Sequence, residues 1–205
     1  RQPGGFGCVV RGAAVTFSSA AFWEARYAGG GGSGSGSRGD NAKHKADYLN
    51  AFVKDHEVRS VVEFGCGDGY QLSLANYPDY VGLDVSETAV EKCRVLFGMD
   101  THKRFYRLPT LWPVTAELVL SLDVTYHLVE QPVYDQHLKD VFGSATRFVV
   151  LYTTDSDVVD PALVSADHVL HRPVCADVAD RFPGWLMIDC LLTLGGSGFY
   201  TYERQ

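Results

Sequence analysis

Glycines at alternate positions follow a short apolar run in the segment Glu63-Phe64-Gly65-Cys66-Gly67-Asp68-Gly69. Glycine adopts backbone angles that other residues avoid and lets a ligand approach the main chain, so the segment predicts a binding turn after a strand. Asp84 ends the next apolar run, Tyr80–Asp84. A carboxylate at the end of the neighbouring strand can accept hydrogen bonds from both ribose hydroxyls. The two features together predict a nucleoside site.

Two further carboxylates are expected at strand ends. Asp123 and Asp155 each follow an apolar run, and carboxylates at adjacent strand ends could hold Mg²⁺, which would orient a diol and acidify one hydroxyl. The alternative is that both carboxylates cap turns or contact solvent or ribose.

A second polar cluster is His168-Val169-Leu170-His171-Arg172, which Pro173 follows. It is expected either as a lid that donates hydrogen bonds to an acceptor such as a sugar, or as a surface loop. In an extended segment the two histidines point different ways, and Pro173 ends any helix near Arg172.

Alternating strands and helices must position these groups. Asp40 and Ser86 are candidate helix N-caps, and another helix is expected near 133–142. A short glycine-containing connection joins the last two apolar runs of the chain, which predicts an antiparallel hairpin. We therefore expect a single Rossmann-like, doubly wound α/β fold, with a mostly parallel sheet and an antiparallel C-terminal hairpin strand. The predicted strands are Ser60–Phe64, Tyr80–Asp84, Glu117–Asp123, Arg147–Tyr152, Trp185–Leu194 and Gly198–Tyr202.

The first 39 residues are irregular, and residues 40–205 are predicted to form the nucleoside-binding domain. A short helix is expected over Phe22–Tyr27, and the Gly/Ser-rich segment Gly29–Ser37 follows it. On composition alone that segment is a flexible linker. A lid over the ligand is the alternative.

Composition limits the function classes. The chain has 205 residues, 46% hydrophobic residues and a formal net charge of -7, which fits one domain and disfavours nucleic acid as a partner. The basic stretch Lys43-His44-Lys45 is expected as the solvated face of a helix. Five cysteines without a C-x-x-C pattern suggest reduced thiols in a cytoplasmic protein, and no run is long enough for a membrane span. A homodimer is left open.

The glycine spacing resembles motif I of class I S-adenosylmethionine (SAM) dependent methyltransferases, [DE]-x-G-x-G-x-G, with Glu63 as the acidic residue. A dinucleotide fingerprint would need glycine where Tyr70 stands. The resemblance covers roughly residues 40–202 and implies SAM as the cofactor. It implies that Gly65, Cys66 and Gly67 line the methionine part of SAM and that Asp84 holds its ribose. Val85 is then expected against adenine, with Leu122 and Asp123 as further cofactor contacts.

The resemblance also assigns roles outside the turn. Trp-Glu-x-Arg-Tyr, from Trp23 to Tyr27, is similar to a short helix placed over SAM, where Arg26 would pair with the methionine carboxylate. The loop after the third core strand, which in this family faces the methyl group, contains Tyr126 and His127. His127 is the preferred general base because its ordinary pKa is about 6.5, with Asp123 and Tyr126 as further catalytic candidates. A structural histidine is the alternative.

A narrower resemblance is to small bacterial methyltransferases that share five pieces: W-E-x-R-Y, a Gly/Ser-rich loop, E-F-G-C-G-D-G, D-V-x-Y-H-L and H-x-x-H-R. Some of these relatives act on saccharides, including mycobacterial methylmannose polysaccharide precursors. The resemblance implies O-methylation of a sugar or oligosaccharide, with His168, His171 and Arg172 binding the acceptor. Methylation of another small metabolite and a non-catalytic SAM-binding regulator remain the alternatives.

Overall fold

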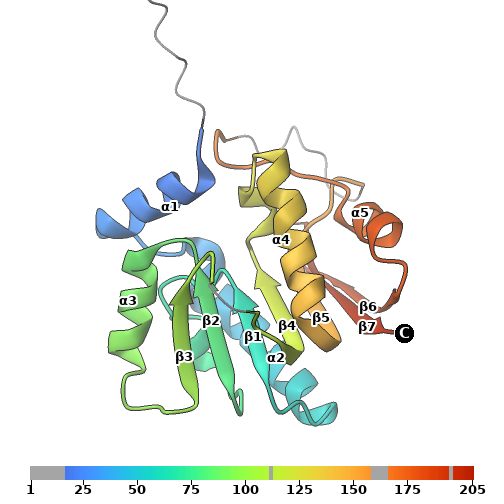
Figure 1. Cartoon of the computed structure of the whole chain (residues 1–205), viewed down its shortest axis with the longest axis horizontal. Helices are drawn as coiled ribbons and strands as arrows, with labels where there is room; N and C mark the ends of the chain where they lie inside the picture. The colour runs from blue at the N-terminus through green and yellow to red at the C-terminus, as the bar shows by residue number, and fades with distance from the viewer. Residues whose placement is uncertain (1–16, 111–112, 158–165, 194–195) are drawn as a thin grey trace, which may run out of the picture.

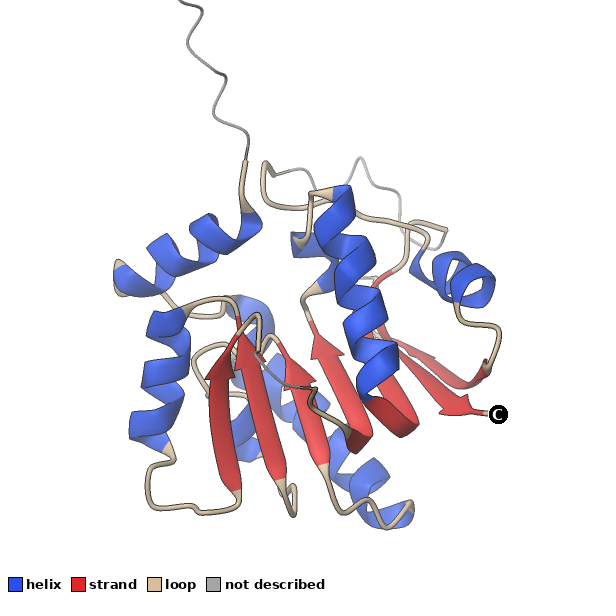
Figure 2. Ribbon diagram, in the orientation of Figure 1, coloured by secondary structure: helices blue, strands red, loops and turns tan. Residues whose placement is uncertain are grey.

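The described part of the chain forms one seven-stranded sheet with helices on both faces (Figures 1 and 2). The computed structural model describes residues 17–110, 113–157, 166–193 and 196–205. The strand order is β3-β2-β1-β4-β5-β7-β6. The strands are β1 (Val61–Phe64), β2 (Tyr80–Asp84), β3 (Lys103–Arg107), β4 (Ala116–Leu122), β5 (Ala145–Thr154), β6 (Trp185–Leu192) and β7 (Ser197–Arg204).

The strand directions agree with the sequence prediction. Strands β1 to β5 pair in parallel, β7 runs antiparallel to β5, and β6 runs antiparallel to β7. The α/β class, the mostly parallel sheet and the antiparallel C-terminal hairpin strand are therefore confirmed. This is the Rossmann-like arrangement in which ligands bind beyond the carboxyl ends of the strands.

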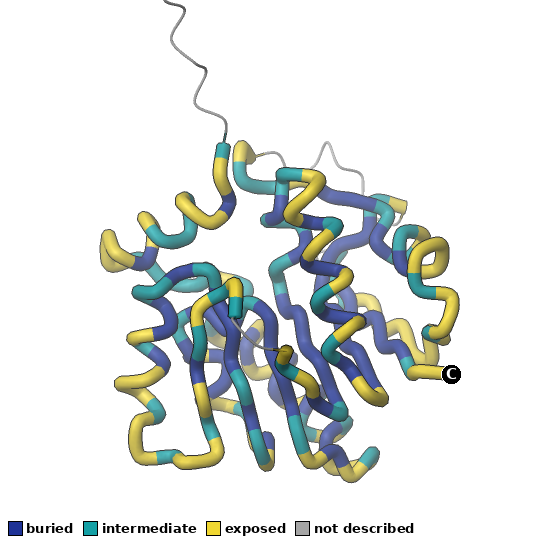
Figure 3. Tube along the Cα trace, viewed as in Figure 1, coloured by how far each residue is buried: buried dark blue, intermediate teal, exposed yellow. Residues whose placement is uncertain are grey.

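Five α-helices in the described residues surround the sheet: α1 (Ser19–Ala28), α2 (Gly39–Asp55), α3 (Glu87–Leu96), α4 (Gln131–Ser144) and α5 (Val174–Arg181). Helices α2 and α3 pack with one apolar cluster, and α4 and α5 pack with the other. Because both faces are covered, the central strands are largely buried on both sides (Figure 3). Ser86 caps α3 as predicted, accepting from Ala89 N at 3.1 Å, whereas Asp40 lies inside the first turn of α2.

Two elements were not predicted from the sequence. Strand β3 reads Lys103-Arg104-Phe105-Tyr106-Arg107, with only Phe105 buried, because it lies at the edge of the sheet. Helix α5 is eight residues long and buries only Val174 and Val178. No helix in the described part of the chain is long and apolar enough to cross a membrane.

Candidate functional site

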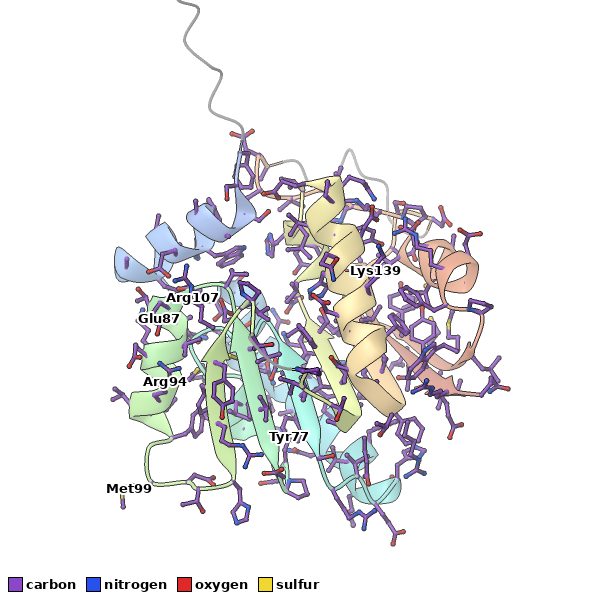
Figure 4. All side chains as sticks on the ribbon, in the orientation of Figure 1. Tyr77, Glu87, Arg94, Met99, Arg107 and Lys139 are labelled. Carbon is purple, nitrogen blue, oxygen red and sulfur yellow. The ribbon has the colours of Figure 1, made fainter. Side chains whose placement is uncertain are left out.

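A cavity of about 990 Å³ opens at the carboxyl ends of β1, β2 and β4. Helix α1 lies across this end of the sheet, between α3 and α4 (Figure 1). Ser19 N donates to Glu130 Oε1 at 2.8 Å, and Thr88 Oγ1 donates to Glu24 Oε1 at 2.5 Å. These bonds fix α1 to the N-terminal ends of α4 and α3. Arg107 and Lys139, both labelled in Figure 4, also line the cavity.

The glycine turn forms one wall of the cavity. Gly65 has φ +85° and Gly67 has φ +58°, values that glycine adopts without steric cost. A Cβ on Gly65 would lie 2.4 Å from Val124 Cγ2, and one on Gly67 would lie 2.4 Å from Ser33 Oγ. Glycine is therefore required here both for the turn and for the close approach of neighbouring segments.

Asp84 lies beside the glycine turn, as the sequence predicted. Its Oδ2 accepts from Gly67 N at 2.9 Å, and its Oδ1 accepts from Ser86 N at 2.9 Å. The residue is 5% exposed and lines the cavity. Burial raises the pKa of Asp84 from 3.8 to about 6. The predicted contacts Val85 and Leu122 line the same cavity.

Glu63 and Cys66 also line the cavity but are largely buried. Glu63 Oε2 accepts a hydrogen bond from Tyr80 OH at 2.6 Å, and burial raises the pKa of this carboxyl to about 7. Glu63 therefore holds β2 against β1 below the turn.

The Gly/Ser-rich segment is folded against the glycine turn. Ser33 Oγ accepts from Asp68 N, and Asp68 Oδ2 accepts from Ser33 N, both at 3.2 Å. Tyr27 OH and Ser33 Oγ are 2.9 Å apart, and Arg38 forms an ion pair with Asp68 at 2.5 Å. A Cβ on Gly36 would lie 3.0 Å from Asp123 Oδ2. The segment thus spans from the glycine turn to Asp123, and its motion as a lid stays a prediction.

The predicted solvated face over Lys43-His44-Lys45 is wrong at Lys45. Lys45 is 0% exposed and lines the cavity, where its ammonium pairs with Asp123 Oδ2. Asp123 Oδ1 accepts from Tyr126 OH at 2.8 Å. Asp123 has φ +59°, an uncommon value for a residue other than glycine. Lys45 and Tyr126 therefore hold a strained residue in place at the end of β4.

His127 lines the cavity one turn beyond Asp123. Its Nδ1 lies 3.0 Å from the His168 carbonyl oxygen. Because a carbonyl can only accept, Nδ1 carries the proton, and Nε2 of the neutral ring carries the lone pair. Burial lowers the pKa of His127, so the ring is neutral at pH 7. The Trp23 ring packs edge-on against it, with ring centroids 4.9 Å apart.

The three side chains of the predicted acceptor-binding cluster contact different parts of the structure. The His168 ring stacks on Phe22 at 4.6 Å and on His127 at 5.4 Å. The buried His171 places Nδ1 2.5 Å from Thr154 Oγ1. Buried Arg172 donates to the carbonyls of Leu128 and Val129 and to Gln131, contacts that indicate a structural role. The His168 ring thus packs on the cavity-lining His127, and the Arg172 guanidinium meets the cavity-lining Leu128 at its carbonyl oxygen.

Arg26 and Asp155 have local partners. Arg26 is exposed and donates to the Gly32 carbonyl at 2.7 Å, so it fixes the Gly/Ser-rich segment. Asp155 accepts from Asp157 N and Cys175 N at 2.9 and 2.7 Å. The cation that meets Asp123 is the Lys45 ammonium, and the described residues contain no group of three or more possible metal ligands. The Mg²⁺ hypothesis therefore has no support.

Gln71 is a cavity residue that sequence reasoning missed. Its Nε2 donates to the Ala42 carbonyl at 2.9 Å, while its buried Oε1 has no partner among the described residues. An unpaired buried acceptor costs stability unless a ligand completes it. In the sequence, the only indication that Gln71 would line the cavity was its position two residues after Gly69.

Comparisons with known families and sequences give only a partial match. No family model matches the sequence. A UPF0146 protein of Methanocaldococcus jannaschii is 23% identical over 90 residues, which cover 43% of this chain and 61% of that protein, less than two thirds of its length.

Solved structures resemble the whole fold. The N-methyltransferase NodS from Bradyrhizobium japonicum, in complex with S-adenosyl-l-homocysteine (SAH), has a TM-score of 0.67 at 10% identity, over 91% of this chain and 98% of its own. Magnesium protoporphyrin IX methyltransferase from Synechocystis PCC 6803 with bound SAM has a TM-score of 0.65 at 15% identity, over 94% and 100%. The fold is thus the one found in these SAM-dependent methyltransferases.

Proposed function

We propose that this chain binds SAM along the glycine turn and methylates a hydroxyl group of a small acceptor. The observation that carries the proposal is the position of Asp84, which lines a large cavity beside the glycine turn and is held there by two backbone N–H groups. Structures of the same fold contain SAM or SAH. When bound, SAM supplies a methyl group on a sulfonium that is already a good leaving group.

The residues present fit this cofactor. The cavity combines apolar surface at Val85 and Leu122 with a carboxylate for the ribose at Asp84. The unpaired Oε1 of Gln71 offers an acceptor to a ligand ammonium group. Gly65 and Gly67 allow the tight turn that brings this stretch of main chain to the cavity.

His127 is the proposed general base. An acceptor hydroxyl is a poor nucleophile at neutral pH, so its proton must leave as the methyl group arrives. The bond from Nδ1 to the His168 carbonyl orients the ring and leaves Nε2 to take that proton. Asp123 and Tyr126 are proposed to position the loop and not to accept the proton. Both Asp123 oxygens are engaged, and burial raises the pKa of Tyr126 far above neutrality.

The proposed acceptor is a sugar or oligosaccharide. Ser18, Ser19, Glu130 and Gln136 line the cavity with groups that can bond to sugar hydroxyls. The net charge of -7 supports a small acceptor over nucleic acid. A second candidate is a planar metabolite, which is favoured by the aromatic wall that Trp23 forms against His127. A non-catalytic SAM-binding regulator would need no space for an acceptor, so the cavity around His127 disfavours that alternative.

A labelled-methyl transfer assay tests the proposal. The protein is incubated with [methyl-³H]SAM and with panels of saccharides and planar phenols, while calorimetry measures SAH binding. We expect SAH binding and transfer to a saccharide. Transfer only to phenols would replace the sugar proposal with the second candidate, SAH binding without any transfer would favour the regulator, and absence of SAH binding would refute the cofactor assignment.

A further inference from the structure

Strand β6 is an edge strand whose outer side is open. Within the described residues it pairs with β7 alone, at the end of the sheet opposite β3 (Figure 1). Its outer main-chain N–H and C=O groups can therefore pair with another strand. Natural proteins usually protect such edges with lysine, proline, a β-bulge that twists the edge away, or a covering segment.

The side chains of β6 do not protect the edge. The sequence from Trp185 to Leu192 contains no lysine or proline, and its only charged residue, Asp189, accepts a hydrogen bond from Tyr48 OH at 2.8 Å. The large apolar residues are partly exposed on both faces: Leu186 54%, Met187 39%, Ile188 39%, Leu191 42% and Leu192 50%. An apolar open edge of this kind indicates a strand partner.

A bulge sets which face each β6 residue occupies. The pairing with β7 skips Ile188, between Met187 and Asp189. Residues opposite Glu203, Thr201 and Phe199 share one face, and those opposite Tyr202, Tyr200 and Gly198 share the other. The first face therefore carries Leu186, Asp189 and Leu191, and the second carries Met187, Cys190 and Leu192.

Because of the bulge, the pattern of faces along β6 matches that of a second, antiparallel copy of β6. In an unbulged strand, Leu186 and Leu191 would lie on opposite faces, because they are an odd number of positions apart. The bulge places them on one face, and it does the same for Met187 and Cys190. Residues at equal distances from the strand centre therefore share a face. A twofold axis perpendicular to the sheet would place such residues directly opposite one another, and directly opposed residues must lie on the same face.

We infer that β6 pairs antiparallel with β6 of a second copy, about a twofold axis between Ile188 and Asp189. Leu186 then faces the partner's Leu191, and Met187 faces the partner's Cys190. Each Asp189 faces the partner's Ile188, so no like charges oppose one another. Apolar residues meet apolar residues on both faces of the joined sheet.

The exposed area suits a reversible dimer. At about 30 Å² for each methyl or methylene group, the five partly exposed side chains offer roughly 300 Å² per copy, or about 600 Å² for the pair. This area is below the ~1,000 Å² that specific interfaces exceed, so the dimer is expected to be weak and to depend on concentration. Backbone hydrogen bonds across the new strand pair add affinity, as in other cases of strand addition.

Sedimentation over a concentration series tests the association. Wild-type protein is expected to move from monomer to dimer at micromolar concentrations, and Leu186→Lys to weaken dimerisation at least about tenfold by placing a charge at the edge. Met99→Lys is the matched control: Met99 is 99% exposed (labelled in Figure 4) and lies outside β6, so the dimer should persist. Circular dichroism checks that both variants fold. A wild-type protein that stays monomeric up to about 100 µM would overturn the inference.

A disulfide tests the register. Directly opposed Cα atoms in antiparallel strands are about 4.5–5.5 Å apart, within disulfide range. Met187→Cys should therefore cross-link to Cys190 of the partner subunit, with copper–phenanthroline and air taking up the two electrons while both thiols lose their protons. Leu192→Cys faces the partner's Trp185 and should not cross-link. Equal cross-linking of the two variants, or a cross-link in Met187→Cys that survives Cys190→Ser, would refute this register.

Discussion

Replacing Asp84 with asparagine should separate the stability of the fold from cofactor binding. In the wild-type protein, burial raises the pKa of Asp84 from 3.8 to about 6. The folded protein therefore holds this proton more tightly than the unfolded chain does. Its free energy of unfolding should fall as the pH rises from about 4 to 6, by about 3 kcal/mol from this group. Asp84→Asn has no such titration.

The substitution also has a cost that does not depend on pH. Gly67 N and Ser86 N each donate to one carboxylate oxygen. Asparagine has a single side-chain oxygen, so one backbone donor loses its acceptor at a cost of about 1–3 kcal/mol. We therefore expect Asp84→Asn to be less stable than wild type near pH 4.5, and equal or more stable near pH 7.5. SAM affinity should fall by about 2 kcal/mol, roughly 30-fold, because a ribose acceptor is lost.

Urea unfolding of both proteins without ligand, at pH values from 4.5 to 8, measures the stability difference, and calorimetry at pH 7.5 measures SAM binding. The unfolding curves compare the variant with wild type, so titration of Glu63, which is present in both, cancels to first order. A difference in stability that stays constant across the pH range would refute the assignment of a raised pKa to Asp84. Unchanged SAM affinity would remove Asp84 from the cofactor site.

Three further predictions concern the loop, the buried ion pair and the Gly/Ser-rich segment. His127→Ala should lower kcat about 10²–10⁴-fold with SAM binding intact, and the wild-type rate should rise with pH through a His127 pKa below 6.5. Near-wild-type turnover of the variant that EDTA abolishes would instead assign proton removal to a metal. Lys45→Met should destabilise the protein by up to about 3 kcal/mol, because the partly buried Asp123 carboxylate loses its cation and keeps only the hydrogen bond from Tyr126, and adding Asp123→Asn should restore part of the loss. Urea unfolding that shows no such rescue contradicts the pairing. SAM should protect Gly29–Ser37 from proteolysis if the segment is a lid, whereas equal cleavage with and without SAM would restore the linker interpretation.

The glycine turn, Asp84 and six of the strands could be predicted because their signals are local. Gly65 and Gly67 reveal a turn by residue type alone, and an apolar run that ends at Asp84 reveals a strand and its end. Strand β3 could not be found in this way, since only Phe105 in it is buried and the edge position leaves no apolar pattern.

Lys45 and His127 show why the rest of the site could not be predicted. Lys45 lies in a polar stretch, and its partner Asp123 is 78 residues away. Nothing near Lys45 in the sequence separates a buried lysine from a solvated one. The tautomer of His127 depends on the His168 carbonyl, 41 residues away. Both features arise from tertiary packing, which brings helices and loops to one end of the sheet.

The charged edge strand β3 limits how far molecules of this protein can assemble. Three of its five residues are basic, Lys103, Arg104 and Arg107, and like charges would face one another if two such edges met. Strand addition is therefore open at β6 and opposed at β3. A sheet with two open edges could polymerise without end, whereas the proposed β6 pairing would stop after one step, because both outer edges of the pair would be β3.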